Sequence, residues 1–489
     1  MNSLNPSPDE FREWGKAAVD AIAKYLGSIG EPPLYPRTSS KEIRQRLNEA
    51  LGKDGTPFPE LLQIFNDTIV SHTRKNGHPR MFGYVQSPGA SLGILADLLA
   101  SGINANLTAW RSAPSPVDLE RMTIDSLKGI LGVDRGAAGL FVSGGSMANL
   151  AALAAARRAK AGPDLLTRGA RSSPRALTLY GSVETHHSIA KAAALLGIGL
   201  DNVRHIPTDG AFKIRLDELE KTIATDIAAG HQPFCVVANA GTVSTGAVDP
   251  LGEVAEIVRQ FGLWMHVDAC YGGFAVMAPS VRHLFSGFSQ ADSIALDPHK
   301  WLYAPMDCGC VLYRDPAVAR STFAHDAEYT RVMEQQDDEA FAFWDYGPEL
   351  SRRFRALKVW MILKGAGTSA LSDAIEDNIA CARHLEELVG SSDDFEMLAP
   401  VELSIFCFRY RPSSLRKVSR DGDGAAEQKL NHFNERLLVA LQRDGSSYLS
   451  NASIGGRFAL RGCVLNYRTT KGDMETLLND LRRLAATLD

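Results

Sequence analysis

The sequence predicts an α/β protein with a mostly parallel central sheet, helices on both faces of that sheet, and a smaller C-terminal α+β domain. Two observations predict this fold class. From about residue 120 onward, short apolar segments typical of buried strands alternate with helical segments, and such alternation indicates a parallel sheet between two helix layers. After Asp315 the alternation stops, and a long helix leads into a separate group of strands and helices.

The N-terminal part of the chain is predicted to be helical. Residues 9–27 carry apolar side chains at helical spacing, a second helix is expected to follow the Ser39-Ser40 cap and end near Leu51, and a third covers 58–71. These amphipathic helices have little of their own to pack against. We therefore expect residues 1–85 to form an arm that docks on a larger body, such as a second subunit; the alternative is a helical lid on its own domain.

Residues 86–370 are expected to form the large α/β domain, which begins with a helix near 92–99. Residues 100–120 are predicted to form a polar loop, with prolines at 114 and 116, that lines a cleft or lies at the surface. The strands are predicted at 139–142, 177–180, 203–206, 235–239, 263–267, 293–296 and 308–312. The helices between them are predicted at 147–160, 188–196, 216–229 and 251–261.

Residues 371–489 are expected to form the small C-terminal domain. Charge-rich residues 324–345 predict an exposed mobile segment, which a long helix near 350–388 follows. The small domain is predicted to contain strands near 403–410 and 458–466 and helices near 427–443 and 471–486.

Bulk composition limits the possible classes of function. The net charge of −5 gives no basic footprint for nucleic acid, and the apolar runs are too short to span a membrane. The N-terminus carries prolines and acids where a signal peptide needs basic and then apolar residues, so a cytoplasmic location is expected. The seven cysteines are scattered through apolar segments and are expected to be reduced; Cys308-Gly-Cys310 has no second pair to complete a metal site.

A lysine at the end of one predicted strand has the properties of a nucleophile. The strand 293–296 must end at Asp297-Pro298, because proline cannot donate to a β-ladder, and this leaves His299 and Lys300 at the strand's carboxyl end. Ligands of α/β proteins bind at that edge. Burial beside Trp301 is expected to lower the pKa of Lys300 and free its amine to attack a carbonyl. The alternative is an ordinary surface lysine.

Three other segments could serve the same site. Ser143-Gly-Gly-Ser146, between a strand and a helix, suits a phosphate group, although many such turns bind nothing. Asp268 follows a buried strand and could pair with a protonated ring nitrogen, or cap a helix or hold an arginine. His186 could stack on a flat ring, or form a hydrogen bond at a helix start.

A phosphate seat, a stacking histidine, a strand-end aspartate and a strand-end lysine together indicate pyridoxal 5′-phosphate as the cofactor. At these residues the chain resembles the group II pyridoxal-phosphate-dependent amino-acid decarboxylases, which include the aromatic-L-amino-acid enzymes. The resemblance rests on the segments His186–Ala192, His266–Gly272, Asp297–Trp301 and Ser351–Lys358. It implies the fold of the pyridoxal-phosphate-dependent transferases (fold type I, aspartate-aminotransferase-like).

The resemblance also implies a role for each site residue. Lys300 would bind the cofactor covalently, Asp268 would hold the ring nitrogen protonated, and His186 would stack over the ring. The remaining cofactor contacts implied are Gly145 and Ser146 at the phosphate, and Thr242, Cys270 and His299 near the ring. Tyr329, in Phe323–Tyr329, would donate a proton to the α-carbon after loss of carbon dioxide.

The predicted reaction is decarboxylation of an aromatic or related L-amino acid to its amine. The candidate substrate contacts are Tyr84, Gln86, Ser87, Asn106 and Thr108. Gln86 and Asn106 resemble the branch of the family that acts on acidic amino acids, whereas Tyr84 and Tyr329 fit the aromatic branch. An aldehyde synthase is a further candidate, against which Tyr329 argues because that activity is associated with phenylalanine there. A non-catalytic protein on the same fold is the last candidate.

Two further expectations follow from the resemblance. Family members are homodimers, so the arm 1–85 should embrace a partner subunit, and residues near 104–111 should reach the partner's site. The family often has asparagine where this chain has Asp297. That residue must either turn away from the phosphate or have its charge offset by a basic neighbour.

Overall fold

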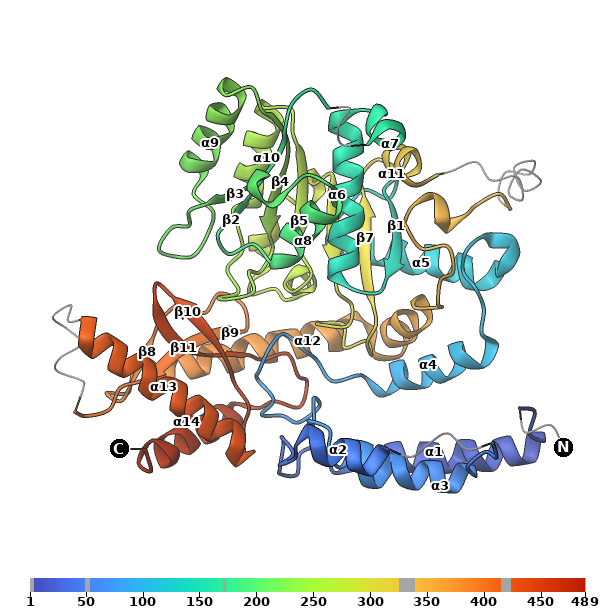
Figure 1. Ribbon diagram of the computed structural model, residues 1–489, viewed down its shortest axis with the longest axis vertical. Helices are drawn as coiled ribbons and strands as arrows, with labels where there is room; N and C mark the ends of the chain where they lie inside the picture. The colour runs from blue at the N-terminus through green and yellow to red at the C-terminus, as the bar shows by residue number, and fades with distance from the viewer. Residues whose placement is uncertain (1–3, 49–52, 170–172, 325–338, 415–423, 489) are drawn as a thin grey trace.

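A computed structural model describes residues 4–48, 53–169, 173–324, 339–414 and 424–488 of the chain. Figure 1 shows a large α/β unit, a smaller C-terminal unit with its own sheet, and a layer of N-terminal helices beneath α4. This is the α/β architecture that the sequence predicts.

The central sheet has seven strands in the order β1-β7-β6-β5-β4-β2-β3. They are β1 (Ala138–Val142), β2 (Leu177–Ser182), β3 (Val203–Ile206), β4 (Gln232–Asn239), β5 (Trp264–Asp268), β6 (Ser293–Leu296) and β7 (Gly309–Tyr313). Strands β2 to β6 run parallel to one another, whereas β7 runs antiparallel to both β6 and β1. Each predicted strand overlaps one of these, so the carboxyl ends of β4, β5 and β6 meet at one edge.

Helices cover both faces of the sheet. One layer contains α6 (Gly145–Ala161) and α8 (His187–Leu195), and the other contains α9 (Leu216–Ala228) and α10 (Leu251–Gln260). In β4, Cys235 and Val237 share a core with α6 and α8, whereas Val236 and Ala238 belong to the core that includes α9 and α10. Burial on both faces is the reason that these strands are apolar throughout rather than alternating.

The small C-terminal unit contains a four-stranded antiparallel sheet in the order β10-β11-β9-β8. Its strands are β8 (Phe395–Met397), β9 (Ile405–Tyr410), β10 (Ser450–Ile454) and β11 (Arg457–Cys463), and its helices are α13 (Gly424–Asp444) and α14 (Lys471–Ala485). Helix α12 (Ala356–Gly390) joins it to the large unit across residue 370, and its backbone is non-helical at Gly367 (φ 77°). The sequence did not predict β8 and β10, which are short and carry few apolar side chains.

The N-terminal helices bury none of their own residues. They are α1 (Pro8–Gly27), α2 (Ser40–Leu47) and α3 (Phe58–Ile64), and a π-helical turn, Phe65–Val70, follows α3 where a single helix was predicted. The connecting chain is fixed to the small unit, since Leu34 N donates to Gly445 O (2.9 Å) and Phe82 N to Tyr448 O (2.9 Å).

The segment 100–120 differs from its prediction as a loop. Helix α4 (Ser91–Ile103) extends into it, and α5 (Pro114–Leu131) begins at its first proline. A proline in the first turn of a helix costs no hydrogen bond, because the amide groups there have no partner within the helix. The two prolines therefore start α5 instead of interrupting the chain. Further short elements are α7 (Asp164–Arg168), α11 (Pro316–Phe323) and 3₁₀ turns at Trp110–Ser112, Leu200–Asn202, Gly273–Met277, Arg282–Phe285, Phe288–Gln290 and Phe343–Asp345.

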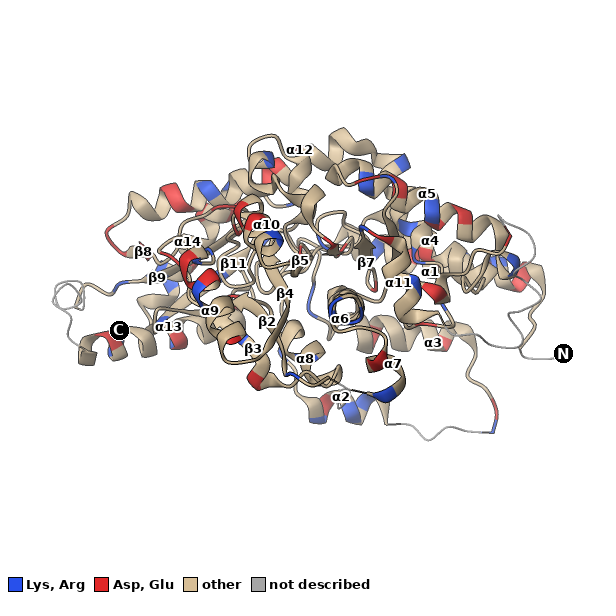
Figure 2. Ribbon diagram, turned by 90° about the horizontal axis from the view of Figure 1, so that it is seen from above, with Lys and Arg blue, Asp and Glu red and all other residues tan. Residues whose placement is uncertain are grey.

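Figure 2 shows basic and acidic residues side by side along α12 and around α5, in keeping with a small net charge. Among the described residues, no helix is both long and apolar enough to cross a membrane.

A buried ion pair fixes the segment before α12 against the sheet. The Arg352 guanidinium pairs with Glu120 of α5, donates to Phe141 O of β1 (2.8 Å) and Leu107 O (2.9 Å), and lies over the Phe343 ring. Both charged side chains are completely buried. Removing one partner of such a pair leaves an uncompensated buried charge.

We therefore predict that Arg352→Met destabilises the protein by about 3–5 kcal/mol, because Glu120 loses its cation. The neighbouring Arg353→Met is the matched control: its side chain is 45% exposed and pairs with Asp97 at the surface, so about 1 kcal/mol or less is expected. Denaturant midpoints followed by tryptophan fluorescence measure both. Equal shifts for the two variants would contradict the prediction.

Candidate active site

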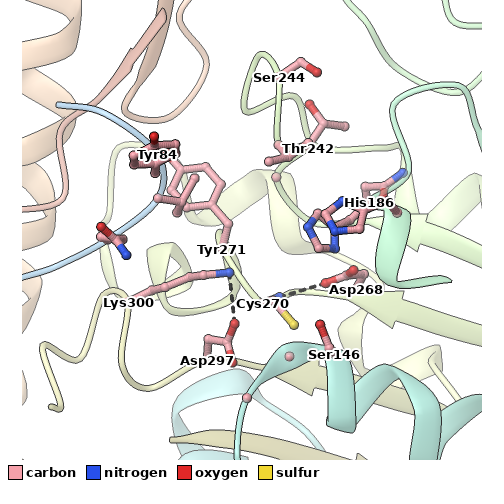
Figure 3. A pocket seen from close by; sticks show the side chains of 18 of the residues that line it. Tyr84, Ser146, His186, Thr242, Ser244, Asp268, Cys270, Tyr271, Asp297 and Lys300 are labelled. Atoms are coloured by element: carbon pink, nitrogen blue, oxygen red, sulfur yellow. Dashed lines mark hydrogen bonds and ion pairs between the residues drawn. The ribbon is translucent and has the colours of Figure 1, made fainter. Parts of the chain in front are cut away.

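A cavity of about 750 Å³ lies where β4, β5 and β6 end. Its walls come from the β1–α6 turn, the strand ends, the segment 84–86, and β10 and β11 of the small unit. Figure 3 shows Lys300, Asp297, Cys270, Asp268, His186 and Ser146 around it, with Tyr84 and Tyr271 above Lys300 in this view. The parallel register brings Asn239 beside Asp268, and so gathers residues that are distant in sequence.

The turn Ser143–Ser146 forms one wall of the cavity, and α6 begins within it at Gly145. A Cβ atom at Gly145 would lie 2.5 Å from Cys270 Sγ and 2.8 Å from Asp297 Oδ2. Only glycine allows this close approach of the helix start to the strand ends. The unpaired amide groups of a helix start, next to the Ser146 hydroxyl, suit a phosphate group.

Asp268 at the end of β5 is held by two donors. Cys270 N donates to Asp268 Oδ1 (3.2 Å), and Asn149 Nδ2 of α6 donates to Asp268 Oδ2 (2.9 Å). Burial acts to raise the pKa of Asp268, but His266, these hydrogen bonds and Lys300 lower it more, so the pKa lies below its ordinary value. Asp268 is therefore an anion that can accept a hydrogen bond from a protonated ring nitrogen.

Asn149 also orients both nearby histidines. Its Oδ1 bonds His266 Nε2 (2.9 Å), and its Nδ2 bonds Ser188 Oγ (2.9 Å), which in turn bonds His186 Nδ1 (2.8 Å). Burial lowers the pKa of His266 to about 4 and also lowers the pKa of His186. Both rings are thus neutral near pH 7, and His186, which also accepts from Ser188 N at the start of α8, presents a flat uncharged ring to the cavity. Of the two alternatives for His186, the helix-start hydrogen bond is present.

Lys300 forms an ion pair with Asp297, with Nζ 2.9 Å from Oδ2 (Figure 3). Burial acts to lower the pKa of Lys300, but Asp297, Cys270 and Asp268 outweigh it, and the pKa lies above its ordinary value. The sequence prediction of a lowered pKa was wrong, because it counted the burial and not the carboxylates. Asp297 does not turn away from the site; its charge is offset by Lys300.

The other predicted residues divide into three groups. Those that line the cavity are Tyr84, Gln86, Thr242, Cys270 and His299. Ser87 lies behind it and donates to His299 O (2.7 Å), while Asn106 and Thr108 are absent from the walls of this cavity. Asn106 accepts from Arg352 N (2.9 Å). Tyr329 lies outside the described residues.

Sequence reasoning missed several wall residues, above all Asn149, Tyr271 and Arg461. Tyr271 lies in the predicted motif and stacks on Trp301, with ring centroids 4.9 Å apart. Arg461 of β11 donates to Tyr84 O (2.7 Å) and Val243 O (2.6 Å), which holds Tyr84 in a left-handed backbone conformation (φ 65°). No local pattern marks Arg461 or Asn149, because both act through tertiary packing.

Comparison with known proteins identifies the family. Residues 40–411 match the model described as the pyridoxal-dependent decarboxylase conserved domain. The chain belongs to this family. An aromatic-L-amino-acid decarboxylase from Bacillus atrophaeus is 36% identical and aligns over 99% of this chain and 97% of that protein. A phenylacetaldehyde synthase from a Rosa hybrid cultivar is 31% identical, over 94% of this chain and 90% of that protein.

Solved structures agree with the predicted fold. Mouse CSAD in apo form has a TM-score of 0.91 at 28% identity, covering 98% of this chain and 99% of that one. Oryza sativa TDC with PLP and tryptamine has a TM-score of 0.90 at 28% identity, covering 100% of this chain and 99% of that one. The predicted family, fold class and cofactor are confirmed: this pyridoxal-dependent decarboxylase is a carboxy-lyase that uses pyridoxal 5′-phosphate.

The residues that line the cavity of this decarboxylase fit the cofactor independently of the family comparison. Ser143–Ser146 could hold a phosphate where a Cβ at Gly145 would collide, Asp268 is an anion for a ring nitrogen, and Lys300 is an amine for the aldehyde. The three groups come from β1–α6, β5 and β6 and face one volume.

We predict that Asn149→Leu weakens cofactor binding by about tenfold or more, because Asp268 loses a donor that fixes it. It should also cost about 1–3 kcal/mol of stability, since His266 and Ser188 lose a partner. The control is Asn434→Leu in the small unit, where a completely buried asparagine bonds Tyr410 and Leu430. That variant should lose stability but keep its cofactor affinity in a fluorescence titration. Equal affinity in wild type and Asn149→Leu would refute the role of Asn149.

Proposed function

We propose that this protein decarboxylates an aromatic L-amino acid to the corresponding amine and carbon dioxide, and that Lys300 binds the cofactor. One observation carries the proposal: Lys300 and Asp268, from the ends of neighbouring parallel strands, face one cavity with the Ser143–Ser146 turn. When bound, pyridoxal phosphate supplies a protonated pyridine ring that withdraws electrons from the bond to be broken.

The protein's part is to hold charges and orient groups. Asp268, kept anionic by its donors, would accept a hydrogen bond from the ring nitrogen and so would favour its protonated form. The neutral His186, which lines the cavity, would stack on the ring without adding a positive charge there. Gly145 and Ser146 would hold the phosphate, while Thr242, Cys270 and His299, which also line the cavity, would limit the position of the ring. A fixed geometry of this kind supplies much of the acceleration without further chemistry from the protein.

The proton that reaches the α-carbon decides the product. We propose Tyr329 as its donor, from the match of Phe323–Tyr329 to the family's loop, which gives an amine. A decarboxylating aldehyde synthase is the second candidate, supported by the 31% identity to a phenylacetaldehyde synthase. Tyrosine at position 329 favours the amine.

The substrate proposal rests on the apolar part of the cavity wall. Tyr84, Val85 and Met306 give it aromatic and apolar surface, and the relative from Bacillus atrophaeus is an aromatic-L-amino-acid enzyme. Gln86 is the polar exception. Arg74 NH2 donates to Gln86 Oε1 (2.7 Å), so the amide nitrogen is the part of Gln86 left to donate to a substrate, such as a ring hydroxyl. An acidic amino acid would use the same donor and is the competing substrate class.

We predict that Tyr, Dopa, Trp and Phe release carbon dioxide with kcat/KM at least about tenfold above Glu, Asp and cysteine sulfinate, because the apolar wall binds a ring, whereas Gln86 offers a second carboxylate an uncharged amide instead of a cation. The amine should be the main product. Carbon dioxide release, together with assays for amine, aldehyde and peroxide, tests both points, and Lys300→Ala is the inactive control. A preference for acidic substrates would refute the proposed substrate class, and aldehyde as the main product would refute the proposed product.

We also propose that the protein is a homodimer with residues 1–85 as an arm on its partner, and that the chain divides into units at residues 85 and 370. Support comes from apolar side chains that one chain leaves exposed on α4, namely Leu95, Leu98, Leu99 and Ile103, and on the arm, including Phe11 and Leu61. Asn106 and Thr108, which do not line their own chain's cavity, are proposed to reach that of the partner.

We predict a mass by light scattering of twice the 53.0 kDa of one chain. Leu98→Glu combined with Leu99→Glu should yield monomers without activity, because two charges cannot be buried unpaired in the interface. Leu195→Glu, at an equally apolar but more exposed position on α8 (76% against 53% for Leu98 and 56% for Leu99), should remain dimeric. A fully active wild-type monomer would overturn the proposal.

We further propose a cytoplasmic location. All seven cysteines are unpaired and buried, which is usual for proteins of a reducing compartment.

A further inference from the structure

Asp297 is the buried carboxylate in direct contact with the Lys300 amine. Its side chain lies one residue beyond β6, and the residue is 3% exposed. Oδ2 is 2.9 Å from Lys300 Nζ, whereas Oδ1 is buried and has no hydrogen-bond partner among the described residues. The same carboxylate borders the Ser143–Ser146 turn, since a Cβ at Gly145 would lie 2.8 Å from Oδ2 and one at Gly144 would lie 4.0 Å from Oδ1.

Loading the cofactor changes the charges around Asp297. Before loading, the Lys300 ammonium balances it; with the cofactor bound as proposed, Lys300 would no longer be an ammonium, and a phosphate would lie at the neighbouring turn. An anionic Asp297 would then face a second anion at close range without its cation, which is unfavourable in a buried site. A protonated Asp297 removes the repulsion, and its unpartnered Oδ1 can then take part in a hydrogen bond.

Lys300 must lose a proton before its amine can react. An ammonium has no lone pair with which to attack an aldehyde, and the pKa of Lys300 lies above its ordinary value despite its burial. A base in contact with Nζ is therefore required, and Asp297 Oδ2 is in contact.

The other titratable groups around Asp297 are poorly suited to this task. His299 Nδ1 is 3.7 Å from Asp297 Oδ1 and is taken up by a 2.7 Å hydrogen bond to Cys308 O, to which it donates. Burial raises the pKa of the Cys270, Cys308 and Cys310 thiols, so they stay protonated. His186 and Asp268 act on Asp297 and Lys300 only through space.

We propose that Asp297 is the base that takes a proton from Lys300 when the cofactor is captured, and that it keeps this proton while facing the phosphate. The Nζ–H bond breaks and an Oδ2–H bond forms. The freed Nζ lone pair attacks the aldehyde carbon, a carbon–nitrogen double bond forms, and the aldehyde oxygen leaves as water with the two remaining Nζ hydrogens. Cofactor capture therefore releases almost no protons to the solvent. This inference rests on the proposed role of Lys300.

The test counts protons during cofactor binding. Calorimetric titration of cofactor-free protein with pyridoxal phosphate, in two buffers of different ionisation enthalpy, is made at about pH 8, where the phosphate is already a dianion. Wild type should release close to no protons, and Asp297→Asn should release about one more, because asparagine cannot retain it. Asp292→Asn is the matched control: Asp292 precedes β6 as Asp297 follows it, but pairs with Arg314 away from the cavity. It should behave as wild type.

Borohydride reduction and peptide mass analysis after loading separate the two proposals. If wild type carries no label on Lys300, the role of Lys300 fails. If wild type and Asp297→Asn are both labelled there and release equal numbers of protons, only the role of Asp297 is overturned.

A measurement on wild type alone covers the case in which Asp297→Asn does not fold. Infrared difference spectra on loading should show the carbonyl band of a protonated carboxylic acid, and ¹³C-aspartate should shift this band. Its absence would equally overturn the proposal.

Discussion

The packing of α6 across the sheet is the contact on which the site depends. One helix touches β4, β5, β6 and β7, starts at Gly145 against Cys270 and Asp297, and carries Asn149 into contact with Asp268 and His266. The proposed phosphate seat, the proposed anion for the ring nitrogen and the orientation of the histidines therefore share one rigid element. Displacement of α6 would alter all three together, which explains the many small alanines on its buried face.

Residues that end strands could be assigned from the sequence. Lys300, Asp268 and Ser146 each follow a short apolar run, so their place at the carboxyl edge follows from local pattern and from the rules of parallel sheets. Asn149 could not be assigned, because an asparagine within an alanine-rich helix has no local signal and acquires its role from what α6 packs against. Arg461 was missed for the same reason, being distant in sequence from the loops it binds. Pro114 and Pro116 show that a proline pair also marks the start of a helix.

The charged residues of the site could be identified from the sequence more readily than the direction in which their pKa values shift. Burial alone lowers the pKa of a lysine, yet Lys300 has Asp297 in contact and Asp268 nearby, and the sum is opposite in sign. Asp268 shows the converse, since burial would raise its pKa and its donors reverse the effect. In both cases the sign depends on distances of about 3 Å between residues from different elements, and residue type and burial do not supply such distances.

Arg461 ties the small unit to two segments that line the cavity. Its guanidinium, carried on β11, donates to the carbonyl of Tyr84, in the segment before α4, and to that of Val243, which follows β4 in the large unit. Phe82 is tied in addition to Tyr448 of the small domain. The segment with Phe82 and Tyr84 is thus bonded to the small unit where Tyr84 borders the cavity, so a shift of the small unit would move this part of the cavity wall with it.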